Sequence, residues 1–209
     1  MFLPFFYGGY MYSEVYMDIV NKCNAHCYYC KTGQSNLTGQ SHKISRYDMT
    51  VEDFDKLVKH LLENKIITEN CLFRIYNWYE PTLNPNLPDI INYMHDHGLR
   101  LDMSTNASVL PDFSRIKTCE HFTGILFSTM SEIRKRGFKG DAYINYHLYQ
   151  FNIEEVYEAK KFADEIGIRL HTMFAYYNGT QGFEEYIKET MTPEIMKKSS
   201  QDLFFYFVD

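Results

Sequence analysis

Residues 15–30 read Val-Tyr-Met-Asp-Ile-Val-Asn-Lys-Cys-Asn-Ala-His-Cys-Tyr-Tyr-Cys, an alternating stretch that leads into three closely spaced cysteines. The first positions of this stretch alternate apolar and more polar side chains, which predicts a β-strand with a period of two. Cys23, Cys27 and Cys30 therefore fall on a loop that follows the end of a strand. The segments further along the chain indicate which kind of sheet that strand joins.

Strand-like and helix-like segments alternate through the rest of the chain. Short apolar or alternating runs predict strands, and apolar residues spaced three and four apart predict helices. The later predicted strands cover residues 72–77, 99–104, 124–129, 142–149 and 168–175. The predicted helices are 54–62 after an N-cap at Thr50, 87–94 before Gly98, 156–166 between an Asn152/Glu155 capping box and Gly167, and a terminal helix from Pro193 to about Tyr206.

This alternation predicts an α/β fold with a parallel sheet, because parallel neighbours need crossover connections and right-handed crossovers place helices on the outer face. An open (β/α) barrel and a doubly wound sheet both satisfy the pattern. In either architecture, ligands collect at the carboxyl ends of the strands. A polar stretch from Asn21 to Met49 is far longer than a usual connection, which makes it a candidate functional loop.

The composition is that of a folded soluble domain. The chain has 209 residues, of which 45% are hydrophobic and 23% are charged. This length predicts a single domain over residues 1–209, with a core at about 14–175 and a C-terminal helical segment after it. The net charge of -6, without a long basic run, disfavours nucleic acid as a partner.

Targeting and disulfide signals are weak in this sequence. The apolar N-terminal residues lack a basic residue before Lys22 and contain Pro4, Gly8 and Gly9, so we predict neither a signal peptide nor a membrane span. The five cysteines divide into the cluster of three and two isolated residues, which is not a disulfide framework. A reducing, cytoplasmic setting fits this distribution.

The cysteine cluster places three soft ligands on one loop, and thiolates suit iron-sulfur clusters or zinc. Three ligands leave one metal position open to a substrate or cofactor. The alternative is a structural zinc site completed by His26, Cys71 or Cys119. We disfavour it because His26 adjoins Cys27 in the sequence and neither remaining cysteine belongs to a second paired motif.

The spacing CxxxCxxC after a first strand, with the aromatic Tyr29 before the last cysteine, resembles the signature of the radical S-adenosylmethionine (SAM) superfamily. The resemblance implies a partial (β/α)6 barrel with a parallel sheet and outer helices. It also implies that Cys23, Cys27 and Cys30 ligate a [4Fe-4S] cluster whose fourth iron binds SAM.

A second motif lies after the second predicted strand. Residues 75–81, Ile-Tyr-Asn-Trp-Tyr-Glu-Pro, resemble the Gly-Gly-Glu-Pro region of the same family, particularly its Tyr-Asn-Trp-Gly-Glu-Pro variants. The resemblance implies that Tyr79, Glu80 and Pro81 contribute to the site for the SAM amino group. Trp78 and Tyr79 fill the two glycine places, where glycine permits close approach of the backbone.

The third and fourth predicted strands end in further polar residues. Ser104, Thr105 and Asn106 resemble the family's segment near the SAM methionine and ribose, and by the same resemblance Ser128 is a ribose-side candidate. A capping or turn serine is the alternative for Ser128. No residue is assigned a catalytic role from the sequence.

The family resemblance also implies the reaction and its partners. We expect reductive cleavage of SAM to a 5′-deoxyadenosyl radical, a reduced flavodoxin or ferredoxin-type electron donor, and a peptide or small-molecule substrate. Two alternatives stay open at this stage. One is a non-catalytic iron-sulfur or zinc domain, and the other is a degenerate or truncated scaffold of the same family.

Overall fold

Six strands form one parallel sheet in the order β1-β2-β3-β4-β5-β6, so every strand pairs with its neighbours in the chain. The structure, a computed structural model, describes residues 11–174 except 28–29, 38–46, 110–111, 113–114, 117–118, 120, 125–126, 137, 139, 149–151 and 153. The strands are β1 (Tyr12–Tyr16), β2 (Ile67–Arg74), β3 (Arg100–Ser104), β4 (His121–Gly124), β5 (Asp141–Leu148) and β6 (Arg169–Phe174). The terminal helix predicted at 193–206 lies outside the described residues.

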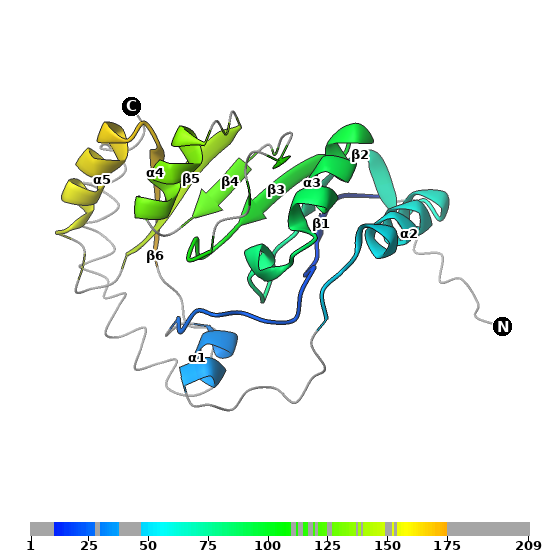
Figure 1. The fold of residues 1–209 in the computed structure, drawn as a ribbon, viewed down its shortest axis with the longest axis horizontal. Helices are drawn as coiled ribbons and strands as arrows, with labels where there is room; N and C mark the ends of the chain where they lie inside the picture. The colour runs from blue at the N-terminus through cyan, green and yellow to red at the C-terminus, as the bar shows by residue number, and fades with distance from the viewer. Residues whose placement is uncertain are drawn as a thin grey trace.

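Four longer helices connect consecutive strands, as parallel pairing requires. The helices are α1 (Lys31–Leu37), α2 (Val51–Glu63), α3 (Leu87–Asp96), α4 (Phe127–Lys135) and α5 (Val156–Glu165), with a 3-10 turn η1 (Pro81–Leu83). Figure 1 shows α2 and α3 over one half of the sheet and α4 and α5 over the other. The short helix α1 lies apart from them, below the sheet in this view (Figure 1).

One face of the sheet packs against the helices and forms the core. Val15, Phe73 and Leu101 lie in register across β1, β2 and β3. Phe54 of α2 packs on Phe73, with ring centroids 6.0 Å apart, and both side chains are fully buried. Burial of these large apolar side chains supplies the main driving force for folding. The core therefore lies between the sheet and α2, α3, α4 and α5.

The opposite face of the first three strands is polar. The guanidinium of Arg74 donates to Glu14 on β1 and to Asp102 on β3, the latter at 2.9 Å. Arg74 also donates to the Tyr76 hydroxyl at 3.1 Å. Asp102 is buried, so its carboxylate depends on this pairing. The sheet thus has one apolar side that carries the helices and one side with an ion-pair network.

Several predicted helix ends are confirmed. The side chain of Thr50 accepts a hydrogen bond from the Asp53 amide at 3.1 Å and caps α2. Gly98 and Gly167 follow α3 and α5 with φ of 66°, a conformation that favours glycine at helix ends. These local signals are strong because a cap or a left-handed residue acts within a single turn.

Three predicted strands have wrong boundaries. The second strand is Ile67–Arg74, whereas we predicted 72–77. The first strand ends at Tyr16, before Ile19, because Ile19 leaves the sheet and accepts a hydrogen bond from the Met49 amide at 2.9 Å. The fourth strand ends at Gly124 and α4 begins at Phe127, whereas we predicted a strand over 124–129. The sequence after Gly124 starts with an apolar run, which suits a strand or a helix, so its pattern does not locate the boundary.

The predicted capping box of α5 is also wrong. The N-cap residue of α5 is Glu155, and no side chain caps it. The side-chain amide of Asn152 instead donates a hydrogen bond to the His147 carbonyl at 3.0 Å, which links Asn152 back to β5. The short helix α1, within the polar stretch that we predicted as a loop, is an additional element.

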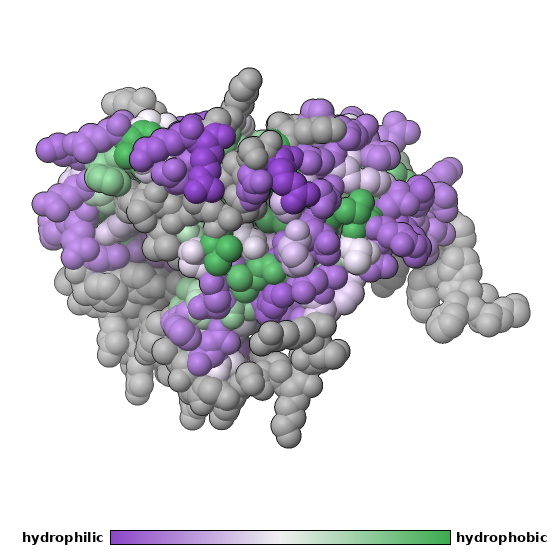
Figure 2. All heavy atoms as spheres, viewed as in Figure 1, coloured by the Kyte–Doolittle hydropathy of each residue, from purple (hydrophilic) through white to green (hydrophobic). Residues whose placement is uncertain are grey.

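The described part of the surface is mainly hydrophilic in one view. In the view of Figure 2, hydrophilic residues cover most of the described surface and hydrophobic residues show only in small patches. Among the described residues, no helix has both the length and the apolar character needed to cross a membrane.

Candidate functional site

Residues 20–30, called the cysteine segment below, are fixed at their start by contacts with neighbouring parts of the chain. Val20 and Asp48 form an antiparallel bridge, and the Lys22 ammonium pairs with the Asp48 carboxylate at 2.7 Å. Asn84 donates through its side-chain amide to the carbonyls of Ile19 and Met49, at 2.9 and 3.0 Å. These contacts hold the start of the cysteine segment beside the chain that enters α2.

Helix α1 folds back onto the cysteine segment. The Asn36 side-chain amide donates to the carbonyls of Cys23 and Ala25, at 2.9 and 2.8 Å. Two backbone acceptors of the segment thus receive donors from one side chain of α1. The position of Cys23 is therefore tied to the helix that follows Cys30.

Gly33 brings α1 into direct contact with the middle cysteine. A Cβ atom at Gly33 would lie 2.4 Å from the Cys27 carbonyl oxygen and 2.5 Å from its nitrogen, so a side chain does not fit without a backbone shift. The Cys30 amide donates to the Cys27 carbonyl at 3.2 Å. This close packing explains why glycine occupies position 33 and fixes the turn that carries Cys27 and Cys30.

The thiol of Cys23 lies in a partly buried, acidic environment. The pKa of Cys23 is raised to about 11, mainly by burial and also by the nearby Glu80, Cys27 and Cys30, while a backbone hydrogen bond from Ala25 acts in the opposite direction. The thiols are thus near enough to interact electrostatically. Within the described part of the chain, no three His, Cys, Asp or Glu side chains are already grouped as a metal site.

A loop at the end of β2 is held by one carboxylate. Oδ1 of Asp18 accepts hydrogen bonds from the amides of Asn77, Trp78 and Tyr79, at 3.0, 3.0 and 3.1 Å. Burial raises the pKa of Asp18, although these three bonds act in the opposite direction. The loop that resembles the Gly-Gly-Glu-Pro region is thereby fixed to the chain that follows β1.

The two residues in glycine places fit this loop without backbone strain. Lys65 and Ala107 are the non-glycine residues with positive φ in the described part of the chain, so Trp78 and Tyr79 do not adopt that conformation. The Tyr79 side chain is half-buried and packs against the core. Trp78 is 46% exposed. The loop therefore does not require the backbone freedom of glycine.

The Glu80 side chain links the loop after β2 to the loop after β3 through hydrogen bonds. Its side chain is 3% exposed and accepts hydrogen bonds from the Thr82 amide at 3.1 Å, the Thr82 hydroxyl at 2.6 Å and the Thr105 hydroxyl. The other carboxylate oxygen accepts from the Asn106 amide at 2.6 Å. Pro81 is buried and begins η1. In this structure the Glu80 carboxylate positions its neighbours.

Asn106 connects the end of β3 to the cysteine segment. Its side-chain amide donates to Oδ1 of Asn24 at 2.7 Å and lies 4.0 Å from the Cys23 sulfur. Asn24 in turn donates to the Ser108 hydroxyl at 2.6 Å. Ser104 is the last residue of β3. The structure therefore brings Cys23, Glu80 and Asn106, from three separate segments, close together.

Other predicted site residues are placed differently. Ser128 lies in the first turn of α4 and not at a strand end, since β4 ends earlier than predicted. Its side chain, like the whole of Tyr29, is outside the described residues. These two predictions therefore have no structural contact to support them.

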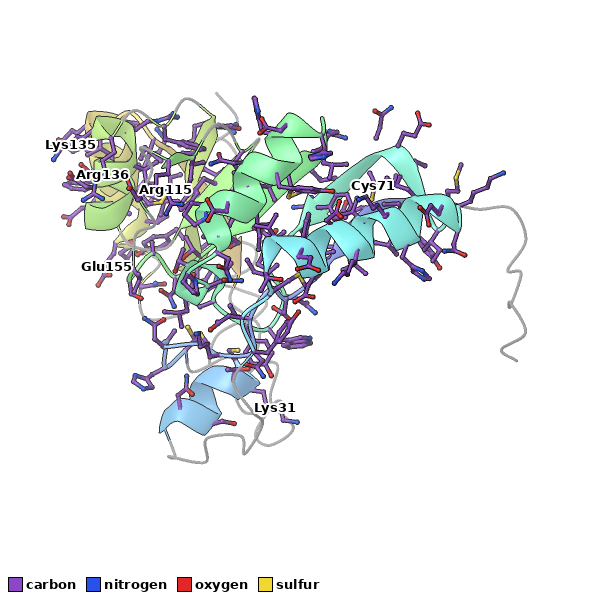
Figure 3. The ribbon with its side chains drawn as sticks, turned by 45° about the vertical axis from the view of Figure 1, so that its right-hand side comes forward. Lys31, Cys71, Arg115, Lys135, Arg136 and Glu155 are labelled. Carbon is purple, nitrogen blue, oxygen red and sulfur yellow. The ribbon has the colours of Figure 1, made fainter. Side chains whose placement is uncertain are left out.

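The remaining cysteines lie in the core. Cys71 on β2 and Cys119, which precedes β4, are both buried, and the Cys119 thiol donates to the Leu101 carbonyl at 3.5 Å. Figure 3 shows Cys71 beside α2, far from Lys31 at the start of α1. None of the five cysteines forms a disulfide. This placement argues against Cys71 as a fourth ligand for the cysteine segment.

Sequence reasoning did not identify several residues that assemble the site. They are Asp18, Asn24 and Asn36, each with at least one hydrogen bond to a predicted site segment. All three are short polar residues that follow β1, adjoin Cys23 or lie on α1. Such positions are a usable signal, but they do not reveal which distant backbone group each side chain binds.

The parallel six-stranded sheet with helices in its connections confirms the predicted α/β fold class. No family model matches the sequence, and no curated protein is significantly similar to it.

Solved structures share the fold at low sequence identity. Streptococcus suis SuiB bound to S-adenosylmethionine matches with a TM-score of 0.68 and 14% identity, over 94% of this chain and 48% of that one. The structure of anSMEcpe with bound AdoMet matches with a TM-score of 0.61 and 15% identity, over 94% of this chain and 58% of that one. The chain thus spans about half the length of these proteins, and the likeness is one of fold.

Proposed function

We propose that this chain is the core of a radical SAM enzyme, in which Cys23, Cys27 and Cys30 hold a [4Fe-4S] cluster. The observation that carries the proposal is the joining of three strand-end segments through Glu80 and the Asn24–Asn106 pair. A structural zinc site would not require the polar loops that follow β2 and β3. The additional polar loops supply contacts that a bound cofactor requires.

The donor set fits the proposed cluster. Three thiolates suit three irons of a [4Fe-4S] cluster, and the fourth iron stays open to SAM. When bound and reduced, the cluster supplies the electron that cleaves SAM to methionine and a 5′-deoxyadenosyl radical, which takes a hydrogen atom from the substrate. The protein residues orient SAM and substrate and exclude water from the reacting groups.

Residues at the strand ends have suitable chemistry for SAM. Backbone carbonyls of the loop before Glu80 accept hydrogen bonds, as an ammonium group requires, and Tyr79 and Pro81 shape that loop. Ser104 and Asn106 carry polar side chains that pair with a carboxylate or with ribose hydroxyls. Tyr29 and Ser128 complete the proposed set by family resemblance alone.

The substrate class is a peptide or a small metabolite. Two solved structures with this fold support the peptide option, since SuiB is bound to the precursor peptide SuiA and anSMEcpe to the Cp18Cys peptide. A reduced flavodoxin or ferredoxin-type protein is the proposed electron donor, and the reducing cytoplasm is the proposed setting.

The direct test of the proposed metal site is anaerobic reconstitution followed by iron, sulfide and zinc analysis. We expect about four iron and four sulfide atoms per wild-type chain. Cys27→Ala should lose most of this cluster, whereas Cys119→Ala, which changes a buried core cysteine, should retain it. Zinc bound without acid-labile sulfide in the wild type would instead support a structural zinc domain.

A further inference from the structure

We propose that Asp18 is a positioning residue for SAM, because its carboxylate sets the conformation of the loop at residues 77–79. This inference rests on the proposed function, since it assigns the loop to the amino group of SAM. Neither the cysteine signature nor the Gly-Gly-Glu-Pro resemblance includes Asp18.

The first step of the inference is the convergence of three consecutive amides on one carboxylate. The amides of Asn77, Trp78 and Tyr79 all donate to Oδ1 of Asp18, and the Trp78 amide also lies 3.2 Å from Oδ2. Asp18 is separated from Trp78 by 60 positions in the sequence. A contact of this kind fixes the loop relative to the chain that leads into the cysteines.

The second step concerns the carbonyl groups. The N–H and C=O groups of a trans peptide point in opposite directions. Because three amides turn toward Asp18, the carbonyls of Tyr76, Asn77 and Trp78 turn away from it. This arrangement presents successive backbone acceptors on one side of the loop, which suits recognition of a ligand ammonium group.

The third step concerns the missing glycines. Trp78 and Tyr79 adopt ordinary negative φ, so the loop is not shaped by glycine-specific dihedrals. Its far end is fixed separately, because the Glu80 amide donates to the Lys22 carbonyl at 3.1 Å. Asp18 and Lys22 thus hold the loop at both ends against the segment that carries the cysteines. A side-chain carboxylate provides here the fixed conformation that glycines permit in the family motif.

The environment of Asp18 matches its role as an acceptor. Burial raises the pKa of this carboxyl group, and the three backbone donors act in the opposite direction. The amides of the loop therefore favour the ionised carboxylate that accepts their hydrogen bonds.

Trp78 makes the loop directly observable, because it is the single tryptophan of the chain. Selective excitation of Trp78 therefore reports on this loop in the apoprotein, without cluster or SAM. We suggest fluorescence anisotropy and acrylamide quenching on the apoprotein, followed by equilibrium SAM binding and cluster content on the anaerobically reconstituted protein.

Three variants separate positioning from general stability. Asp18→Ala removes both carboxylate oxygens that accept from the loop amides. Asp18→Asn keeps one acceptor oxygen. Asp55→Ala is the matched control, because Asp55 on α2 is paired with Lys59 and Tyr93, away from the loop.

For Asp18→Ala we expect lower Trp78 anisotropy, stronger quenching and at least about tenfold weaker SAM binding, with unchanged iron and sulfide content. Asp18→Asn should recover part of both signals, and Asp55→Ala should change neither. Unchanged Trp78 signals and SAM affinity in Asp18→Ala would overturn the inference. If the reconstituted wild type binds no SAM, the proposed function fails, while the apoprotein fluorescence still decides whether Asp18 sets the loop.

Discussion

The helix-covered face of strands β1 to β3 and the loops at the carboxyl ends of these strands are held together by different forces. On the helix side, Phe54, Phe73 and Met94 are fully buried in apolar contacts. At the carboxyl ends of the same strands, Asp18 and Glu80 bind backbone amides from other segments. Apolar burial is non-directional, whereas these hydrogen bonds depend on exact donor and acceptor positions.

This difference separates stability from site geometry. Loss of a core side chain should lower the free energy of unfolding while the folded fraction keeps its site. Loss of a carboxylate at the strand ends should cost less stability but displace the loops that we assign to SAM. Substitutions on the two sides therefore test whether the two properties are as separable as the structure indicates.

The largest stability effect is expected from Phe73→Ala. Phe73 is fully buried against Phe54, so its removal should lower the free energy of unfolding by about 3–5 kcal/mol through lost burial and a cavity. Urea unfolding measures this loss. A loss below about 1 kcal/mol would show that the core relaxes to fill the cavity at position 73. It would contradict the view that stability depends mainly on the helix-covered face.

An intermediate effect is expected from Glu80→Ala. The substitution leaves the amides of Thr82 and Asn106 without their acceptor and should cost about 2 kcal/mol. The affinity of the reconstituted protein for SAM should fall far more in Glu80→Ala than in Phe73→Ala. Phe73→Ala is measured under conditions in which it is folded. Glu80→Gln, which retains one acceptor oxygen, is the control and should lose less. Equal SAM affinity in wild type and Glu80→Ala would remove the proposed positioning role of Glu80.

The smallest effect is expected from Tyr93→Phe on the helix side. Burial and the hydrogen bond to Asp55 raise the pKa of Tyr93 to about 12. The unfolded chain loses this proton near its ordinary pKa, so wild-type stability should fall as the pH rises from about 10 to about 12. Tyr93→Phe should lack that component of the pH dependence and cost at most about 1 kcal/mol at neutral pH. Thermal unfolding of both proteins across this range measures the difference, and identical slopes would contradict it.

The sequence predicted elements whose signals are local. Thr50 and Gly98 act within one helix turn, and both were confirmed. The boundary near Gly124 was wrong because the sequence after Gly124 starts with an apolar run, and apolar residues suit either element. The misplacement of Ser128 follows directly from that boundary.

The site was predictable to the extent that each segment carries its own motif. Cys23, Glu80 and Asn106 were identified separately, and the parallel topology explains why they meet. Asp18 was not identified, because its role depends on amides 59 to 61 positions away. Asn36 was missed for a similar reason, since it belongs to a short helix within a polar stretch.

The most direct test of the account is 5′-deoxyadenosine formation after anaerobic reconstitution, chemical reduction and addition of SAM. The account predicts product from the wild type, none above background from Cys27→Ala, and product from Cys119→Ala. A wild-type protein that carries a full cluster but forms no 5′-deoxyadenosine would contradict it and support a scaffold that has lost turnover.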